Sequence, residues 1–348
     1  MGAGTVLVCA VQVPLVEGGA EDHVRQLVSQ LRARGYRSDL VAVPYKWYPK
    51  EEIFSHAAAW RLLDLSESNG ERIDCVIATR FPSYCVRHPN KAIWLLHQHR
   101  AAYDLCGAPF CPDFGWDAMD VAARDRLIAL DTRMIAEARR VYANSAVVAA
   151  RLEQYNGLSA QPLHHPPRLA PRLRPGPPGD YVLSVGRLET LKRVDLAVRA
   201  LALAPPALRL VVAGDGPQRP ALEALASEAG VGDRVRFAGR VDDEALVGLY
   251  SGALAVVFAP FDEDYGYVTL EAMLSAKPVV TARDSGGVLE FARHGVNALV
   301  CEPSPGAMAE AFAALDADRR LAASLGEAGR QRASEVTWDG VIEKLLGE

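Results

Sequence analysis

Two glutamates eight positions apart are the first residues in this sequence whose spacing suggests chemistry. Glu263 and Glu271 lie in the stretch FDEDYGYVTLEA, with Tyr-Gly-Tyr between them. The first follows an apolar run that predicts a strand, and the second lies about one turn into the helix expected next. Two solvated surface carboxylates are one interpretation. The other is a pair that accepts hydrogen bonds from the hydroxyl groups of one ligand, since each carboxylate offers two acceptor oxygens.

Two cations follow another predicted strand. In VGRLETLKR, Gly186 lets the chain turn sharply where the apolar run YVLSV ends, and Arg187 and Lys192 come next. Two cations beside helix amino termini suit a diphosphate group. Exposed basic residues on an ordinary loop are the alternative, but a pair in this position favours an anion site.

Paired glycines open the helix that we expect after the first strand. Gly18 and Gly19 would let backbone N–H groups approach an anion or a sugar closely. A plain turn from strand to helix would have the same sequence. The pair Gly286-Gly287 is similar and, as an isolated dipeptide, equally weak as a signal.

A histidine pair follows the apolar run KAIWLL. Seen alone, a histidine after a strand is more often structural. We favour His97 over His99 as the residue nearer to any reacting group, because His97 follows the strand directly.

The elements that must position these residues alternate regularly along the chain. Continuous apolar strands between helices indicate parallel sheets covered on both faces, which is an α/β class with two doubly wound, Rossmann-like domains. The strands are expected at 5–13, 38–44, 73–79, 91–97, 141–145, 181–185, 208–214, 235–239, 255–260 and 278–282. The helices are expected at 21–35, 123–140, 145–157, 194–204, 219–230, 242–253, 267–276 and 286–295.

A proline-rich seam divides the two halves. We expect an amino-terminal domain at 1–166, a linker at 167–179 and a carboxy-terminal domain at 180–333, with a last helix at about 334–348 that could pack on either domain. Ligands of open α/β sheets bind at the carboxyl ends of the strands. The cleft between two such domains is therefore the expected site.

Composition excludes several classes of function. The chain has 348 residues, half of them apolar, and a net charge of −5, which argues against broad nucleic-acid binding. No run approaches the roughly 18–20 apolar residues of a membrane span. The start lacks a basic region, and Gln12 and Pro14 interrupt its apolar run, so we expect no signal peptide. The six scattered cysteines suggest reduced thiols and a cytoplasmic location. Helices that carry Arg133, Arg139 and Arg140 suggest at most peripheral membrane contact.

The spacing Glu-x7-Glu, with Tyr-Gly inside it, resembles the signature of the retaining glycosyltransferases of family 4. The surrounding sequence is similar to that family through most of residues 181–315, from SVGRLETLKRVDLAVRAL to AMLSAKPVVTARDSGGVLEFARHGVNALV. The first domain is similar in outline only, through GGAEDHVRQLVSQLRARG and LLHQHR. The resemblance implies a fold of GT-B type, with two Rossmann-like domains that face each other across a cleft.

The resemblance also implies a role for each residue. Arg187 and Lys192 would neutralise the donor diphosphate, Glu263 would contact the donor sugar and Glu271 would bind the ribose. Gly18 and Gly19 would approach the phosphates, and His97 would lie beside the reacting sugar. The remaining donor-binding residues would be Arg240, Val241, Tyr265, Gly266, Tyr267 and Val268.

One position departs from the family pattern. Asp264 stands where the family often has glycine, which restricts the loop and leaves donor sugar recognition open. Asp262, Glu263 and Asp264 superficially suggest a metal site. We reject it, because the family needs no metal and the two cations already supply positive charge.

The implied reaction moves a sugar from a nucleoside diphosphate, most plausibly a UDP- or GDP-sugar, to a hydroxyl of a sugar, lipid-linked or small-molecule acceptor, with retained anomeric configuration. No cofactor is required. The alternatives are a nucleotide-sugar epimerase, a phosphorylase or a non-catalytic sugar-nucleotide-binding subunit. The aromatic stretch YKWYPKEEIF could form part of an acceptor wall through Trp47, although an exposed loop would explain it equally well.

Overall fold

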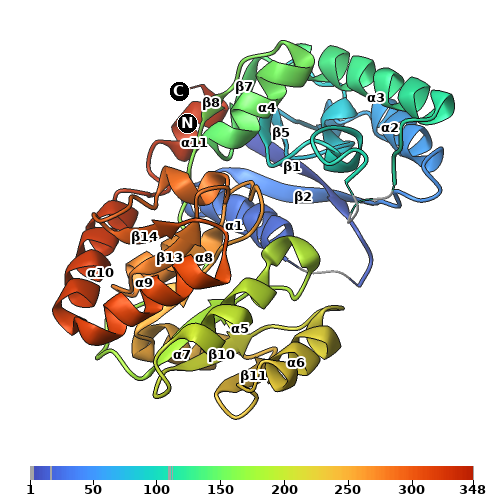
Figure 1. The fold of residues 1–348 in the computed structure, drawn as a ribbon. Helices are drawn as coiled ribbons and strands as arrows, with labels where there is room; N and C mark the ends of the chain where they lie inside the picture. The colour runs from blue at the N-terminus through green and yellow to red at the C-terminus, as the bar shows by residue number, and fades with distance from the viewer. Residues whose placement is uncertain (1–3, 16–17, 109–110, 112, 348) are drawn as a thin grey trace. The chain divides into compact units, whose positions relative to one another are not determined.

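The computed structural model describes residues 4–15, 18–108, 111 and 113–347, and Figure 1 traces their elements. The chain divides into two compact units. The first comprises Met1–His165 together with Thr337–Glu348, and the second comprises Pro166–Val336.

The first unit is built on a parallel sheet. Its elements are β1 (Thr5–Gln12), α1 (Gly19–Ala33), β2 (Arg37–Pro44), α2 (Glu52–Leu62), β3 (Glu67–Ser68), β4 (Glu71–Arg72), β5 (Cys75–Ala78), the 3₁₀ turn η1 (Ser83–Cys85), β6 (Lys91–Leu95), the 3₁₀ turn η2 (Arg100–Ala102), α3 (Ala118–Ala136), β7 (Arg140–Ala143), α4 (Ala146–Asn156), β8 (Gln161–Pro162) and α11 (Val341–Leu346). The strand order is β2-β1-β5-β6-β7-β8, with every pair parallel, and β3 and β4 form a separate antiparallel hairpin.

Alternation along the strands explains why helices cover both faces of this sheet. Cys9 and Val11 point into a core shared with α2, α3 and α4, whereas Val8 and Ala10 point into a second core shared with α1 and α11. Successive side chains of a strand face opposite ways, so an uninterrupted apolar strand needs cover on both sides.

The second unit repeats this architecture. Its elements are β9 (Tyr181–Val185), the 3₁₀ turn η3 (Thr190–Lys192), α5 (Val194–Leu203), β10 (Arg209–Ala213), α6 (Arg219–Glu228), β11 (Val235–Gly239), α7 (Asp243–Gly252), β12 (Ala255–Val257), α8 (Tyr267–Leu274), β13 (Val279–Ala282), the 3₁₀ turn η4 (Gly287–Glu290), β14 (Ala298–Cys301), α9 (Pro305–Ala317) and α10 (Arg319–Ser334). Its strand order is β11-β10-β9-β12-β13-β14, again all parallel. The predicted α/β class with two doubly wound sheets is confirmed.

The order of strands in the second unit reverses between β9 and β12. The chain runs outward from β9 to β11, then returns to the other side of β9 and continues through β14. The connections that leave β9 and β12 therefore lead to opposite halves of the sheet, and open α/β sheets bind ligands at the carboxyl ends of the strands where the order reverses.

The last helix packs on the first unit. Trp338 lies 9% exposed in the core formed with α1, and its ring meets the Trp94 ring edge to face at 5.9 Å. The helix itself is shorter than the expected 334–348, because α10 continues to Ser334 and α11 begins only at Val341.

One predicted helix is wrong. Residues 286–295 form only the 3₁₀ turn η4 before the chain turns toward β14. Gly287 N donates to the carbonyl oxygen of Glu263, and Asn297 Oδ1 accepts from the backbone of Arg293. These contacts fix both ends of a short connection and leave no room for several helical turns.

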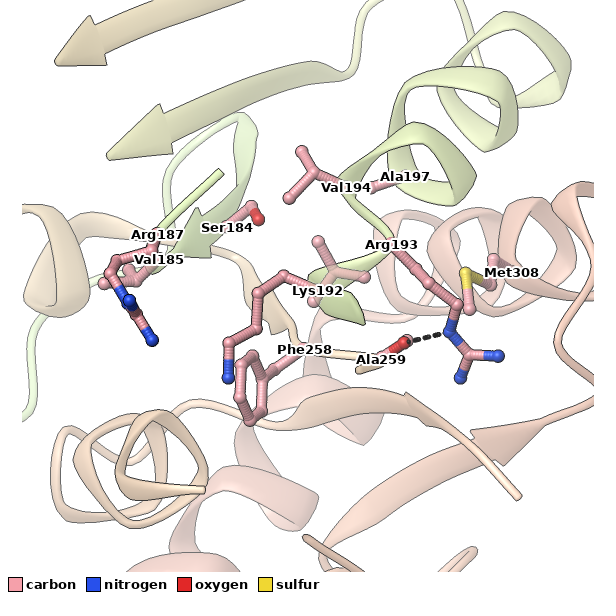
Figure 2. Close-up of a pocket in the computed structure, with 11 residues that line it drawn as sticks. Ser184, Val185, Arg187, Lys192, Arg193, Val194, Ala197, Phe258, Ala259 and Met308 are labelled. Atoms are coloured by element: carbon pink, nitrogen blue, oxygen red, sulfur yellow. Dashed lines mark hydrogen bonds between the residues drawn. The ribbon is translucent and has the colours of Figure 1, made fainter. Parts of the chain in front are cut away.

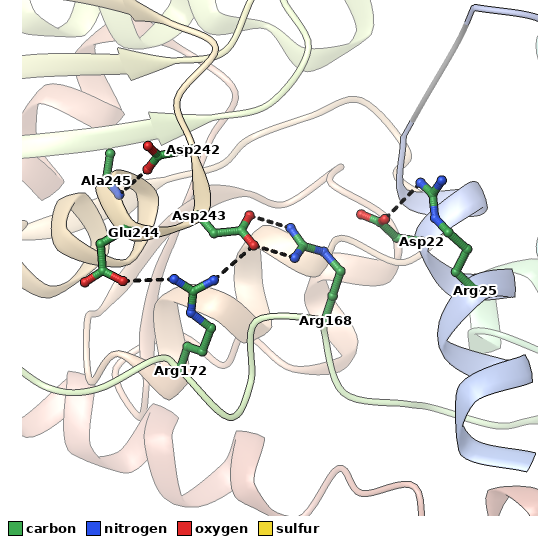
Figure 3. A network of polar contacts seen from close by, with 8 residues as sticks. All are labelled: Asp22, Arg25, Arg168, Arg172, Asp242, Asp243, Glu244 and Ala245. Carbon is green, nitrogen blue, oxygen red and sulfur yellow. Dashed lines mark hydrogen bonds and ion pairs between the residues drawn. The ribbon is translucent and has the colours of Figure 1, made fainter. Parts of the chain in front are cut away.

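The proline-rich segment expected as a linker at 167–179 lies within the second unit. Arg168 makes a two-pronged ion pair with Asp243 at the start of α7, and Arg172 bridges Asp243 and Glu244 (Figure 3). Further along, Lys277 Nζ donates to the carbonyl oxygen of Gly176 at 2.7 Å. The segment is therefore fastened to this unit at several points.

Candidate functional site

The loops after β9 and β12 meet through a salt bridge. Lys192 Nζ lies 2.5 Å from Glu263 Oε2, and the two side chains are 20% and 21% exposed. The same ammonium lies 5.7 Å from the centre of the Phe258 ring. The structure thus brings together one predicted cation and one predicted acid at the point where the strand order reverses.

Arg187 lies close to Lys192 but remains more exposed. Both residues line one pocket, and their side-chain nitrogens point to the same side of it in Figure 2. The Arg187 side chain is 59% exposed and makes a salt bridge with Glu189 at 2.8 Å. An exposed pair of this kind contributes little stability, so Arg187 can exchange Glu189 for an anionic ligand at small cost.

Backbone contacts fix the loop that carries Arg187. Leu188 N donates to Asp215 O at 3.0 Å, and Leu188 O accepts from Gln218 N at 2.9 Å. Gly214 has φ 138°, and a Cβ there would collide with the carbonyl oxygen of Gly186. The glycine after β10 is therefore needed for the two loops to pack together.

The pocket that Arg187 and Lys192 line, between the loop after β9 and the end of β12, is small. Its volume of about 10 Å³ is enough for roughly one water molecule. A group much larger than a water molecule therefore does not fit inside it.

Arg193 is a cation that the sequence analysis did not single out. Its guanidinium binds both oxygens of Asp284, at 2.8 and 2.6 Å, and donates to the carbonyl oxygens of Ala259 and Pro260. Figure 2 shows it turning away from Lys192 toward Ala259. The hydrogen bond from Arg193 lowers the pKa of Asp284, outweighing partial burial, which raises it. Arg193 thus braces the loop after β12, while its neighbour Lys192 pairs with Glu263.

The loop of Glu263 is also tied to the loop after β13. Asp262 N donates to Asp284 O at 2.9 Å, and Glu263 O accepts from Gly287 N at 2.7 Å. Gly286 has φ 59°, and a Cβ there would lie 2.6 Å from the carbonyl oxygen of Glu263. The pair Gly286-Gly287 therefore allows two loops to approach closely, which is a structural reason for both glycines.

The Tyr-Gly-Tyr segment forms the start of α8. Gly266 is the residue before the helix, with φ 81°, and Tyr267 and Val268 begin the first turn with half-buried side chains. Tyr265 is only 4% exposed and its ring packs edge to face on Phe291 at 5.6 Å. Any ligand contact by Tyr265 would therefore come from its backbone.

Glu271 lies one turn into α8, as expected, and accepts a hydrogen bond from the buried Tyr250. The Tyr250 hydroxyl lies 2.7 Å from Glu271 Oε2. Burial and the neighbouring carboxylate raise the pKa of Tyr250 well above its ordinary value. Tyr250 comes from α7 and therefore orients Glu271 from a different element. No local sequence pattern predicts such a contact between two helices.

Arg240 and Val241 directly follow β11, two strands away from β9. Arg240 is exposed, whereas Val241 packs on the core beneath α7 and α8. They share the carboxyl edge of the sheet with the Lys192–Glu263 pair without contacting it through any hydrogen bond of the described residues.

The first unit carries the other predicted residues. Gly18 is the residue before α1 and Gly19 is its first residue, with Glu21 and Asp22 in the first turn. Glu21 pairs with Arg80, which follows β5, at 2.7 Å. These carboxylates already complement the helix dipole. Val16 and Glu17, just before the glycines, lie outside the described residues.

The histidines after β6 differ in environment. His97 is half-buried, and its Nδ1 lies 2.7 Å from the carbonyl oxygen of Gln98. His99 lies 3.5 Å from the Tyr45 hydroxyl through Nδ1, and burial, followed by the proximity of His97, lowers its pKa to about 4. His99 is therefore neutral near neutral pH.

In the part of the chain that the structure describes, no group of three or more His, Cys, Asp or Glu residues is placed to hold a metal ion. Within the same residues, no helix combines the length and the apolar character that crossing a bilayer would require.

Residues 171–332, inside the second unit, match the model of the family described as "Glycosyl transferases group 1". D-inositol 3-phosphate glycosyltransferase of Nocardia farcinica is 34% identical over 62% of this chain and 53% of its own length. Human alpha-1,3/1,6-mannosyltransferase ALG2 is 32% identical over 44% of this chain and 41% of its own length. The chain thus spans about half the length of the curated relatives it matches.

Solved structures share the fold across nearly the whole chain. Sucrose-phosphate synthase from Thermosynechococcus elongatus superposes with a TM-score of 0.74 at 21% identity, covering 97% of this chain and 96% of its own. Anabaena HepE in complex with UDP-glucose gives 0.73 at 18% identity, covering 99% and 98%. The fold is of GT-B type, and residues 171–332 of the second unit match the group 1 glycosyl transferase model.

Proposed function

We propose that this chain is a retaining glycosyltransferase that moves a sugar from a nucleoside diphosphate to an acceptor hydroxyl. The Lys192–Glu263 salt bridge at the strand reversal carries the proposal, because it pairs a diphosphate-binding cation with a sugar-binding acid within the matched domain. The names of the relatives, which include an inositol phosphate glycosyltransferase and a mannosyltransferase, support the same class of reaction.

In this proposal the donor binds along the carboxyl edge of the second sheet. Arg187 and Lys192 neutralise the diphosphate, Glu263 binds the sugar hydroxyls and Glu271 binds the ribose. The donor is a UDP- or GDP-sugar, and the UDP-glucose held by Anabaena HepE is a precedent for the first. The residues assigned to the remaining donor contacts are Gly18, Gly19, Arg240, Val241, Tyr265, Gly266, Tyr267 and Val268.

Binding would exchange one ion pair for two ligand contacts. In the free protein Lys192 and Glu263 satisfy each other, so neither is left as an unpaired, partly buried charge. A donor offers a diphosphate to the ammonium and hydroxyl groups to the carboxylate. Both groups keep a partner throughout, which makes the exchange inexpensive.

The chemical step breaks the bond between the anomeric carbon and the diphosphate oxygen and forms one to the acceptor oxygen. Negative charge grows on the departing diphosphate, and preorganised cations there stabilise the transition state, which is usually the largest catalytic contribution. The acceptor proton passes to the leaving diphosphate on the same face of the sugar. The role of His97 beside the reacting sugar is part of the proposal.

The test is thermal melting against UDP-, GDP-, ADP- and dTDP-sugars, with and without magnesium. A ligand at 100 times its dissociation constant stabilises the protein by about 2.7 kcal/mol, which is easily measured. We expect one nucleotide class to raise the melting temperature of the wild type and to have little effect on Glu271→Ala.

A matched control is needed because Glu271→Ala also leaves the Tyr250 hydroxyl without its acceptor. Each shift is therefore measured against the variant's own ligand-free melting temperature. Tyr250→Phe removes the same hydrogen bond but keeps the carboxylate, and it should retain most of the shift. If no nucleotide shifts the wild type, donor binding in the absence of acceptor is refuted. Proton NMR of the anomeric signal in the product then decides between retention and inversion.

A further inference from the structure

An aromatic pocket lies at the strand-end edge of the first unit. It has a volume of about 300 Å³, at the small end of the range for ligand sites, and opens where β1 and β2 end. Its wall is one short segment, Tyr45 to Tyr48, faced by His56 from α2. The size suits a single ring.

The rings of this wall hold one another at right angles. Trp47 and Tyr48 meet edge to face at 5.4 Å, and Tyr45 meets His56 edge to face at 5.3 Å. Tyr45 is 9% exposed and anchors the wall in the core, whereas Tyr48 is 58% exposed. Exposed aromatic faces held by buried ones form a rigid apolar platform.

Polar groups complete the pocket. The backbone N–H of Lys46 donates to His56 Nε2 at 3.2 Å, so the proton of the neutral imidazole lies on Nδ1, where it can serve as a donor. The Lys46 ammonium lies 4.8 Å from the centre of the Tyr48 ring. Apolar faces flanked by a few donors match a ring that has C–H faces and hydroxyl edges.

Tyr45 connects this pocket to the histidine loop after β6. Its hydroxyl lies 3.5 Å from His99 Nδ1, and its ring lies 6.1 Å from Phe81, which follows β5. A ring held in the pocket would therefore be separated by one tyrosine from the loop that carries His97, the residue proposed to lie beside the reacting sugar.

We propose that this pocket binds a polyhydroxylated ring of the acceptor, either a sugar or a cyclitol, and that Trp47 supplies its main apolar face. The identification of this ring as part of the acceptor rests on the proposed function. The proposal that the pocket binds such rings does not depend on the transferase activity, because all the residues involved belong to the first unit.

The test is saturation-transfer NMR on the full chain. The probes are methyl α-glucopyranoside, methyl α-mannopyranoside, myo-inositol and myo-inositol 1-phosphate, with cyclohexanol as a ring that lacks the other hydroxyl groups. We expect at least one polyol to bind the wild type and cyclohexanol to bind much more weakly. Loss of an aromatic anchor should weaken binding roughly tenfold in Trp47→Ala, and less in Trp47→Phe.

Trp116→Ala is the matched control, because Trp116 is 70% exposed in the same unit and lies outside the pocket lining. It should bind the polyol like the wild type. Binding to no polyol, equal binding of cyclohexanol, or binding that Trp47→Ala leaves unchanged would each overturn the subsite. The nucleotide melting shift, measured on Trp47→Ala in parallel, should persist. If the polyol binds and no nucleotide shifts the melting temperature even with the polyol present, the subsite stands and the transferase proposal fails.

Discussion

The carboxyl edges of the two sheets are built from different interactions. In the second unit, ion pairs and backbone hydrogen bonds join the loops after β9, β12 and β13, through Lys192–Glu263 and Arg193–Asp284. In the first unit, the loops after β2, β5 and β6 meet mainly through rings, those of Tyr45, Phe81 and His99. The two sheets are alike, but their loops are held by charge in one and by aromatic packing in the other.

This difference suits two kinds of ligand. Cations fixed in place by ion pairs match a group of constant charge and shape, such as a diphosphate. Aromatic walls with few polar groups accept rings that differ in the position of a hydroxyl group. We infer that the second unit binds the invariant part of the donor, and that the first unit can change its ligand by changing a few rings.

The largest effect is expected from a change at the carboxyl edge of the second sheet, called the charged edge below, where Lys192 pairs with Glu263. Lys192→Ala should lower the rate of diphosphate release from the donor by roughly 100- to 1,000-fold, the usual cost of removing one preorganised donor from a transition state. The rate is measured as nucleoside diphosphate formed from whichever sugar nucleotide shifts the melting temperature. Lys46→Gln, at the aromatic carboxyl edge of the first sheet, should alter only the acceptor concentration that gives half of the maximal rate.

Arg209→Ala is the control for that variant. Arg209 is exposed at the amino end of β10, on the opposite edge of the same sheet, and its ion pair with Asp180 is long at 3.7 Å. Its rate should match the wild type. If Lys192→Ala is as active as Arg209→Ala, the charged edge has no role in catalysis and the comparison between the two edges loses its functional meaning.

A lower pH should destabilise the first unit through a pair of buried histidines. His23 and His165 are fully buried in the first unit, with Nδ1 of His23 2.9 Å from Nε2 of His165. Burial lowers the pKa of His23 to about 3 and that of His165 well below 6.5. Near pH 6.5 these two histidines bind protons in the unfolded chain and not in the folded chain, so their contribution to the free energy of unfolding falls as pH drops below 6.5. The expected loss is about 1.4 kcal/mol per pH unit for each histidine.

The measurement is urea unfolding at about pH 7.5 and about pH 5.5, followed by tryptophan fluorescence, since Trp94 and Trp338 lie against this pair. His165→Gln cannot titrate and should remove about 1.4 kcal/mol of the loss between these two pH values. His294→Gln, exposed in the second unit, should leave it unchanged. A pH dependence that His165→Gln leaves unchanged would show that the pair is not buried as a neutral couple.

The Arg193–Asp284 brace should give a smaller effect with a different pH dependence. Asp284→Asn should lower the free energy of unfolding by about 1–2 kcal/mol, because the carboxylate is partly exposed and its charged hydrogen bonds are screened. The folded pKa of Asp284 is lowered. Its stabilisation is therefore present above the unfolded pKa near 3.8 and is lost only as pH falls below that value.

Arg283→Ala is a control one residue away. Arg283 and its partner Glu302 are 64% and 54% exposed, so this variant should change stability by no more than about 0.5 kcal/mol. If the two variants are equally stable in urea unfolding, Arg193 does not brace the loop. A loss for Asp284→Asn that already disappears at pH 5 would contradict the assigned pKa direction.

Much of the fold was predictable because the strands are buried on both sides. The strands expected at 181–185 and 235–239 have the predicted bounds, since an uninterrupted apolar run bounded by turns leaves few alternatives. Residues 286–295 were wrongly predicted as a helix. Their apolar pattern is helical, but Gly286 and Gly287 are held by Glu263, more than 20 residues earlier in the chain.

The candidate site was predictable as a set of residue types and not as a set of contacts. Strand ends and residue chemistry pointed to Arg187, Lys192 and Glu263. The partner of each depends on tertiary distance: Arg193 and Asp284 are 91 positions apart, and Tyr250 and Glu271 are 21 apart on different helices. A single sequence has no period or motif that records such pairs.

The smallest effect expected concerns Glu271. Tyr250→Phe removes the hydroxyl that donates to the Glu271 carboxylate. Losing this hydrogen bond should lower the free energy of unfolding by about 1 kcal/mol. The carboxylate remains, so the nucleotide should still raise the melting temperature, but with an affinity reduced a few fold because Glu271 loses a fixed orientation. Titration calorimetry with the nucleoside diphosphate measures this. If Tyr250→Phe binds as poorly as Glu271→Ala, the hydroxyl itself contacts the donor, and the second unit would then use a buried ring at its site as the first unit does.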